Sequence, residues 1–470
     1  MKLGVTRVMS RYIKHIEAEG VLGRFDIDQE FQEGVNVLFG KNGTGKTTLL
    51  HILANLLNGD YKRFAFTEFK TIRVQLSDET NIFISKHKNE KDSHLNVKID
   101  DKNVAENLSI NEICEQEEAR EDRVALPSIT RKRMVVQKLR EYEEIEPILP
   151  VAYFPAFRTM IEAWASAEDK LKNPKEIQVL NTNFARQLFG SFVPSLNYPS
   201  PIEIERELSD EIDEALLNIA NADREHFGEL FTSIFHVLSK DTHSSESNSL
   251  KEAGSEVILE EITSLVKKLE NYPLKAAPTI TQLRSSVSSF QLDEQSKRIA
   301  ERVLYIYRKA LQEVVSVQDT SFKRIKTYLN SINSFLEGKS IAINLAASKL
   351  RGQKSVEIRF ESGYPKRIPG IGRALSSGER QIVTLIYAAT HMSKQKIVLI
   401  DEPEISLHVA WQRHLLQKMS DQLGERQIIV CTHSPVIGAD YEDRVVIFEP
   451  KITYSSENIT YSDLLEEDCA

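Results

Sequence analysis

The sequence predicts an α/β fold with a long, mostly α-helical insertion, and three observations support this. A glycine-rich loop at 40–47 stands between a β-prone apolar run and an apolar run of helical spacing. A second apolar run, 397–400, ends in two carboxylates, as buried parallel strands do at the edge where α/β folds bind ligands. Between these blocks, 160–340 is polar and helix-prone. We therefore expect two lobes of one α/β unit with a helical insertion between them.

Length and composition limit the number of structural units and the class of protein. The chain has 470 residues, so we expect two or three structural units. No apolar run approaches the roughly 20 residues of a membrane span, and no signal peptide is evident. Three cysteines without paired spacing favour a reducing, cytoplasmic environment over a disulfide framework or a zinc site. The net charge of −9 disfavours a surface that coats nucleic acid, but it leaves a local basic groove open.

The first lobe begins with β-structure. Residues 11–39 and 70–100 show apolar positions separated by polar turns, which predicts antiparallel strands. The piece from 105 to 146 is charge-rich and expected to be partly helical. Its basic run at 131–133 is more often a solvated face than a nucleic-acid contact. A short strand and turn, 151–158, closes the lobe.

The insertion carries helical patterns, such as Ile212, Ala215, Leu216 and Ile219. It shows no sustained heptad run, so any coiled coil is expected to be short. It also shows no metal-ligand spacing. Its histidines, His226, His236 and His243, are scattered and are expected to be surface or packing residues. From 341 the alternation typical of strands returns.

The loop at 40–47 fits G-x-x-x-x-G-K-[ST], the phosphate-binding loop, and has the strand-loop-helix context that this motif requires. Glycines let several N–H groups point at one phosphate, and the helix N-terminus adds partial positive charge. Lys46 would reach the β- and γ-phosphates, and the Thr47 hydroxyl would ligate Mg²⁺. The candidate nucleotide-binding residues are Gly40, Asn42, Gly43, Gly45, Lys46, Thr47 and Thr48. A glycine-rich turn that binds nothing is the alternative, and the flanking elements disfavour it.

The second informative block lies after 375. Ser376, Ser377 and Gly378 open an apolar helical run, and such a turn presents hydroxyls and N–H donors suited to an anion. Asp401, at the end of the apolar strand, would hold Mg²⁺ together with Thr47. Glu402 would act as the general base or orient the attacking water. His433 follows another apolar strand and would contact the γ-phosphate or polarise the water. Each of these residues alone also fits a helix cap or an ordinary loop position, but their order after a phosphate loop makes coincidence implausible.

This order of motifs resembles the ABC-type ATPase family, and more narrowly the branch of RecF, SMC, Rad50 and the OLD ATPases. The signature motif matches 375–381, the D-loop matches 404–408 and the switch histidine matches His433. The segment 153–158 looks like the Q-loop counterpart, with Arg158 where other branches carry Gln, so Arg158 joins the candidate nucleotide contacts. The two matching lobes cover about 1–158 and 340–450.

The resemblance implies an ABC-ATPase head, built of a mixed sheet with a flanking antiparallel β-subdomain and helices. It implies a first lobe at 1–158, a helical insertion at 159–340 that serves oligomerisation or partner binding, and a second lobe at 341–470. It also implies ATP and Mg²⁺ as cofactors and hydrolysis of ATP to ADP and phosphate, with Lys46, Glu402 and His433 as catalytic residues. ATP in this family lies between the phosphate loop of one subunit and the signature loop of the other. We therefore expect at least a head-to-tail, ATP-sandwiched dimer completed in trans by Ser376, Ser377 and Gly378.

OLD-type nucleases continue after the switch histidine into a Toprim domain, whereas 37 residues follow His433 here. The chain is similar to the ATPase subunits of the antiphage systems Septu (PtuA) and PARIS (AriA). That resemblance implies a cytoplasmic regulatory or scaffold subunit that controls a separate nuclease of the HNH or Toprim type, with DNA or a phage protein as the candidate trigger. The alternative is a RecF- or SMC-like ATPase of DNA repair or chromosome maintenance that binds DNA directly. A transporter ATPase is a distant third reading, which the large insertion opposes.

Overall fold

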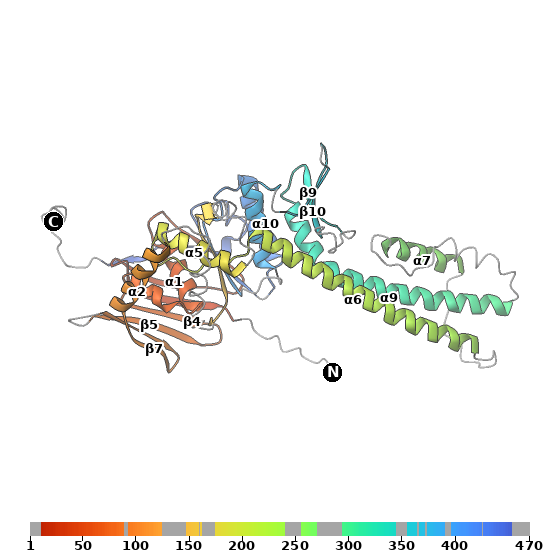
Figure 1. Ribbon diagram of the computed structural model, residues 1–470, viewed down its shortest axis with the longest axis horizontal. Helices are drawn as coiled ribbons and strands as arrows, with labels where there is room; N and C mark the ends of the chain where they lie inside the picture. The colour runs from red at the N-terminus through yellow and green to blue at the C-terminus, as the bar shows by residue number, and fades with distance from the viewer. Residues whose placement is uncertain are drawn as a thin grey trace. The chain divides into compact units, whose positions relative to one another are not determined.

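The computed structural model describes residues 11–88, 93–124, 147–158, 160–161, 174–239, 255–269, 294–344, 355–363, 366–371, 374–390, 396–424 and 426–453. The chain divides into two compact units. Met1–Ser200 and Ser376–Ala470 form the first unit, and Pro201–Leu375 forms the second. Figure 1 labels some of the helices and strands of both. The α/β fold class predicted from the sequence is confirmed, with parallel and antiparallel sheets, flanking helices and a long helical segment.

A five-stranded parallel sheet lies at the centre of the first unit, in the order β14-β3-β13-β12-β8. Its strands are β3 (Val35–Phe39), β8 (Val151–Phe154), β12 (Ile397–Asp401), β13 (Gln427–Thr432) and β14 (Val445–Ile447). Every residue of β8, β12 and β13 is buried, which explains why these segments are almost wholly apolar. Because all the strands are parallel, the loops that follow β3, β12 and β13 come together at one edge of the sheet.

Helix α1 (Lys46–Leu57) contacts β8, β12 and β13 of this sheet. Its apolar residues are fully buried, and it ends at Asn58, followed by Gly59 in a left-handed conformation. Two further helices of this unit, α10 (Ser377–Ala389) and α11 (Val409–Ser420), pack against each other. The start of α1 is therefore fixed at the edge of the sheet where the strand-end loops meet.

A separate seven-stranded antiparallel sheet has the order β15-β2-β1-β4-β5-β6-β7. Its strands are β1 (Ile13–Val21), β2 (Phe25–Glu30), β4 (Thr71–Leu76), β5 (Asn81–Lys88), β6 (Ser93–Ile99), β7 (Lys102–Ser109) and β15 (Lys451–Ile452). Buried and exposed residues alternate along β1, β2 and β4, as one covered face requires. This sheet is the antiparallel β-subdomain that the sequence predicted.

The charge-rich piece after 105 is helical in part, as expected from the sequence. Residues up to Ser109 continue β7, and α2 (Ile110–Val124) begins only at Ile110. Pairing of β7 with β6 overrides the polar composition, because ladder hydrogen bonds do not depend on side-chain polarity. The basic run at 131–133 lies outside the described residues. The 3₁₀ helix η1 (Tyr61–Phe66) packs against α2, and the 3₁₀ helix η3 (Glu442–Arg444) precedes β14.

The second unit is built on long helices. Helices α6 (Pro201–Ser239) and α9 (Glu294–Asn333) pack along each other, and α7 (Ser255–Leu269) packs on α9 (Figure 1). Among the apolar positions predicted at helical spacing, Ile212 and Ile219 are each 1% exposed. A three-stranded antiparallel sheet completes the unit, with β9 (Lys339–Ile343), β10 (Val356–Phe360) and β11 (Arg367–Pro369).

The limits of the compact units differ from the limits drawn at 159 and 340. Helix α5 (Pro174–Phe189) belongs to the first unit, where Arg186 forms an ion pair of 3.0 Å with Asp60. Strands β9 to β11 belong to the second unit, where Glu205 of α6 accepts the backbone N–H of Ile371 at 2.7 Å. These polar contacts join segments that carry no motif, so the sequence did not reveal them. None of the described helices combines the length and apolar character needed to cross a bilayer.

Candidate nucleotide site

The phosphate loop stands between β3 and α1 in the first unit. Gly43 and Gly45 have φ angles of +77° and +89°, in the left-handed region that glycine adopts without strain. The Lys46 amine donates to the carbonyl oxygens of Gly40 and Lys41 at 2.7 and 2.8 Å. Asn42 and Gly43 are exposed at the tip, and Thr48 is half-buried in the first turn of α1. The loop is therefore closed around its own lysine, with its tip open to solvent.

Thr47 and Asp401 join the two halves of the predicted site. The Thr47 hydroxyl donates to Asp401 Oδ2 at 2.8 Å, although 354 positions separate them in the chain. Asp401 is 3% exposed, and burial raises its pKa to about 6. Its other oxygen, Oδ1, has no hydrogen-bond partner among the described residues. A hydroxyl beside a buried carboxylate with an unsatisfied oxygen is a hard donor set, and it fits Mg²⁺.

Glu402 and His433 lie side by side at the same edge of the sheet. His433 Nδ1 is 3.5 Å from Glu402 Oε1, and both side chains are partly open to solvent, at 47% and 27% exposed. The Glu402 backbone has φ +46°, an uncommon angle for a residue with a side chain. Strained backbone of this kind is found where a structure fixes a functional side chain. The two residues predicted to act on the attacking water are thus adjacent.

Glu404 is a residue of this site whose role sequence reasoning missed. Its Oε1 accepts the Thr432 hydroxyl at 2.6 Å and the backbone N–H groups of His433 and Ser434 at 3.2 Å each. The same oxygen is 3.4 Å from His433 Nδ1. The acidic run Asp-Glu-Pro-Glu contains the signal, because a second glutamate close behind a strand-end pair needs a partner if it is buried.

Arg158 is 1% exposed, and it acts on the backbone that follows β12. Its guanidinium donates to the carbonyl oxygens of Asp401, Glu402 and Pro403 at 3.1, 3.2 and 3.2 Å. It also donates to the side chain of Gln381 in α10 at 3.3 Å. In this structure Arg158 therefore shapes the turn that carries Glu402, whereas a nucleotide contact remains a prediction. Partners more than 200 positions away could not be read from the sequence.

The signature turn begins α10. Ser376 is its N-cap, and Ser376 and Glu379 form a capping box in which the Ser376 N–H donates to Glu379 Oε2 at 2.7 Å. Ser376 and Ser377 are exposed, and Gly378 is buried. A Cβ at Gly378 would stand 2.8 Å from the Ser406 carbonyl oxygen, so only glycine lets the D-loop approach this closely. The turn is thus a capped helix N-terminus with two exposed serines, and the Ser376 hydroxyl oxygen accepts the Glu379 N–H at 3.4 Å.

Behind the phosphate loop, His51 of α1 and Tyr153 of β8 join helix to sheet. His51 Nε2 is 2.8 Å from the Tyr153 hydroxyl. Burial lowers the pKa of His51 to about 3, so its imidazole is neutral at physiological pH. Burial also raises the pKa of Tyr153, which keeps its hydroxyl protonated. The pair fixes the helix whose N-terminus carries Lys46 and Thr47.

Comparisons with known proteins find chains that are similar to this one. A curated relative, the Retron Vc95 probable ATPase of Vibrio cholerae serotype O1 biovar El Tor, is 24% identical over 186 residues. The match covers 39% of this chain and 32% of that relative, so the chain matches about a third of the relative's length.

Two solved structures are also similar along nearly their whole length. One is the Smc head domain with an extended coiled coil bound to the C-terminal domain of ScpA from Pyrococcus furiosus. It has 15% identity and a TM-score of 0.39, and the match covers 97% of this chain and 99% of that one. The other is the recombination mediator protein RecF, at 13% identity and a TM-score of 0.33 over 95% of this chain and 99% of that one.

A family model described as the AAA ATPase domain matches residues 24–437, a range that includes the phosphate loop, Arg158, the signature turn, Asp401, Glu402 and His433. That range is well over half of the 470 residues. The chain therefore belongs to the AAA ATPase domain family.

Proposed function

We propose that this chain binds ATP with Mg²⁺ at the Thr47–Asp401 pair and hydrolyses it with Glu402 as the general base. The observation that carries the proposal is the meeting of a phosphate loop, an Mg²⁺-compatible oxygen pair and a glutamate–histidine pair at one edge of one sheet. Convergent groups of this kind, from strand ends and a helix N-terminus, are the parts that phosphoryl transfer needs.

Each residue has a distinct role in this mechanism. Lys46 would exchange its two loop carbonyls for phosphate oxygens, because a charged acceptor forms the stronger hydrogen bond. Thr47 and Asp401 would hold Mg²⁺, which supplies charge that offsets the negative charge of the phosphates. Glu402 would accept a proton from the attacking water, while His433 would donate to the phosphoryl oxygens. Arg158 would keep Glu402 in position through the backbone carbonyls of the same turn.

The signature turn supports a site shared between two copies. Ser376 and Ser377 are exposed at the start of α10, where the helix dipole favours an anion. We infer that Ser376, Ser377 and the Gly378 N–H bind the ATP held by the phosphate loop of a second copy. ATP would then join two chains head to tail, and hydrolysis would release them.

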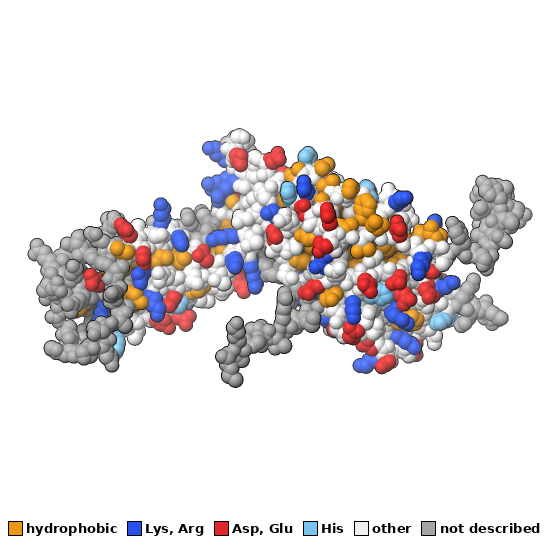
Figure 2. Space-filling view, turned by 180° about the vertical axis from the view of Figure 1, so that it is seen from behind, with side chains coloured by type: hydrophobic (Ala, Val, Ile, Leu, Met, Phe, Trp, Pro, Cys, Tyr) orange, Lys and Arg blue, Asp and Glu red, His pale blue; other side chains and the backbone are white. Residues whose placement is uncertain are grey.

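We further propose that the ATPase regulates a separate nuclease in antiphage defence. Its support is the resemblance to the ATPase subunits of two-component defence systems and the similarity to a chain named as the probable ATPase of a retron. DNA or a phage protein remains the candidate trigger. The second candidate is an ATPase that binds DNA directly, as the resemblance to RecF and SMC suggests. Figure 2 shows basic and acidic side chains interspersed over the visible face of the first unit, which gives no support to a large DNA-binding patch on that face.

The two roles predict different measurements. A regulatory subunit should form a stable complex with the nuclease encoded beside it, and should change that nuclease's activity when ATP is hydrolysed. A DNA-binding ATPase should bind duplex DNA by itself, with an affinity that falls steeply with salt. Co-purification of the neighbouring gene product, and DNA binding by the ATP-bound Glu402→Gln variant at 50 and 200 mM salt, separate the two. Strong DNA binding without a nuclease partner would contradict the regulatory role.

A further inference from the structure

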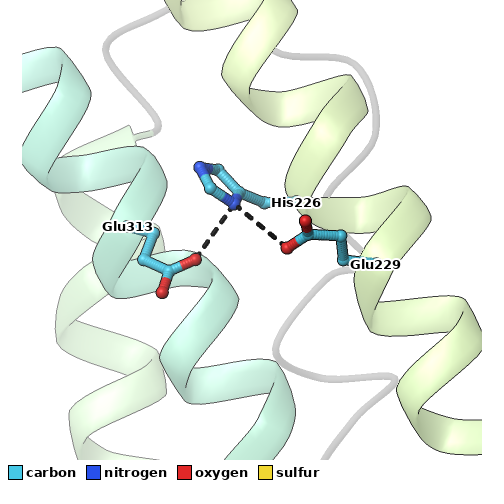
Figure 3. A group of neighbouring side chains, drawn as sticks. All are labelled: His226, Glu229 and Glu313. Carbon is cyan, nitrogen blue, oxygen red and sulfur yellow. Dashed lines mark ion pairs between the residues drawn. The ribbon is translucent and has the colours of Figure 1, made fainter.

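Three potential metal ligands meet between the two long helices of the second unit. His226 and Glu229 lie on α6, and Glu313 lies on α9 (Figure 3). His226 Nδ1 is 3.0 Å from Glu313 Oε2 and 3.9 Å from Glu229 Oε2. All three ligand atoms lie within 4.8 Å of one another. The sequence suggested only a scattered histidine here, because Glu313 comes from another helix.

The spacing of these atoms fits one small ion. Bonds of about 2.0–2.2 Å in a tetrahedral arrangement place neighbouring ligand atoms roughly 3.4 Å apart. The separations of 3.0 and 3.9 Å fall on either side of that value. Small rotations of the two glutamates, whose side chains are 72% and 42% exposed, would therefore bring all three atoms to bonding distance without moving the helices.

The histidine nitrogen itself is available. Nδ1 is buried, and it makes no aligned hydrogen bond among the described residues, although Glu313 lies 3.0 Å away. The side chain as a whole is 21% exposed, so the ring lies against the helices and Nδ1 points between the two carboxylates (Figure 3). A buried nitrogen without an aligned donor or acceptor is costly as it stands. Coordination of a cation would satisfy its lone pair and neutralise both carboxylates.

The donor set decides the kind of ion. One imidazole nitrogen with two carboxylates suits Zn²⁺ and similar transition ions, whereas Mg²⁺ and Ca²⁺ prefer oxygen ligands alone. Helix bundles also build metal sites in their cores from side chains on facing helices. We propose that His226, Glu229 and Glu313 bind one Zn²⁺-class ion, with water as a fourth ligand, and that the ion cross-links α6 to α9.

This site is separate from the proposed ATP chemistry, because its residues belong to the second compact unit. The test uses the full chain, treated with EDTA and free of nucleotide. Zn²⁺ binding is measured by isothermal titration calorimetry, and Co²⁺ is added as a spectroscopic probe. We expect one Zn²⁺ per chain, micromolar or tighter affinity, visible Co²⁺ absorption typical of tetrahedral coordination, and little heat with Mg²⁺.

Variants assign the ion to this place. His226→Ala should weaken Zn²⁺ binding at least tenfold and abolish the Co²⁺ absorption, and Glu229→Gln, at a highly exposed position, should weaken it several-fold. The matched controls, His236→Ala and Glu225→Gln on the same helix, should bind as the parent does. Asp401→Asn should also bind Zn²⁺ normally, which separates this site from the nucleotide site. Absence of stoichiometric Zn²⁺ binding, or equal affinity in His226→Ala, would overturn the proposal and leave the three residues as an ion pair only.

Discussion

The Glu404 carboxylate accepts the backbone N–H of His433 at 3.2 Å and also lies 3.4 Å from Nδ1 of the same histidine. One oxygen, Oε1, makes both approaches and accepts the Thr432 hydroxyl as well. Glu404 therefore fixes both the backbone and the ring of the predicted switch histidine. A residue that holds a catalytic side chain in place contributes to the rate through positioning, so its loss lowers kcat.

Variants of Glu404 distinguish the orientation of His433 from the binding of ATP. Glu404→Ala removes all of these contacts, so kcat for ATP hydrolysis should fall at least tenfold, while the Kd for ATP changes less than threefold. Glu404→Gln keeps Oε1 as an acceptor and loses only the charge, so it should retain more activity than Glu404→Ala. Steady-state kinetics and nucleotide titration measure both quantities, with Glu442→Gln on η3 as the control. An unchanged kcat in Glu404→Ala would show that His433 needs no such support.

The raised pKa of Asp401 predicts how the free energy of unfolding depends on pH. Its pKa is raised to about 6 in the folded protein, mainly by burial, from an ordinary value of 3.8. Between these values the folded state binds more protons, so this group lowers the free energy of unfolding as pH rises from about 4 to 6. Asp401→Asn should therefore be more stable than the parent at pH 7.5 in EDTA, by roughly 1–3 kcal/mol, and should be inactive.

Urea unfolding at pH 5 and pH 7.5 measures this effect. The advantage of Asp401→Asn over the parent should be larger at pH 7.5 than at pH 5. Added Mg²⁺ with ATP should stabilise the parent more than the variant. A difference that does not depend on pH would mean that the Asp401 charge is not the cause.

The lowered pKa of His51 has the opposite effect, because it predicts that the free energy of unfolding falls as the pH is lowered. Its pKa is about 3 in the folded protein against an ordinary value of 6.5, so the unfolded state binds more protons between these limits. The contribution of His51 to the free energy of unfolding is fully present above about pH 6.5. It decreases as the pH falls below that value, by roughly 1 kcal/mol at pH 5.5. His51→Gln should remove this part of the acid sensitivity. Urea midpoints of parent and variant at pH 7.5 and 5.5 should diverge accordingly, and parallel pH profiles would contradict the prediction.

Substitution of Arg158 distinguishes a structural role for this residue from direct contact with the nucleotide. Arg158→Gln places there the residue that other branches carry, and it removes the donors to the backbone carbonyls of 401 to 403. We expect a loss of about 2–4 kcal/mol in unfolding free energy and a lower kcat, with the Kd for ATP nearly unchanged. Chemical denaturation and ATP titration measure these. A tenfold weaker Kd with normal stability would instead support direct contact with the nucleotide.

The sequence predicted those parts of the site whose cause is local. The strand, loop and helix at 35–57 were predicted because the glycines, the apolar strand and the apolar helix face lie within one short stretch. Asp401 was predicted to share a metal with Thr47 because parallel strands place their ends together, and the structure brings the two to 2.8 Å. The signature turn was recognised for the same local reason, since the two serines and the glycine lie next to the apolar helical run that they open.

What the sequence did not reveal depends on contacts between distant segments. The carbonyl oxygens that accept hydrogen bonds from Arg158 lie more than 240 positions after it in the chain. No periodicity in the sequence indicates this contact. The meeting of Glu313 with His226 depends on how α9 packs against α6. The strand at 102–109 depends on its pairing with β6, which the mostly polar residues of the segment did not reveal.

We propose above that two copies of the chain share each ATP through the signature turn. The most direct test is light scattering of the hydrolysis-deficient Glu402→Gln variant with and without ATP. We expect ATP to double the mass from the 53.6 kDa of one chain, and we expect the added Ser376→Arg substitution to abolish this doubling while ATP is still bound. A mass that ATP does not change would contradict the shared site. A doubling that persists in the Ser376→Arg variant would contradict it as well.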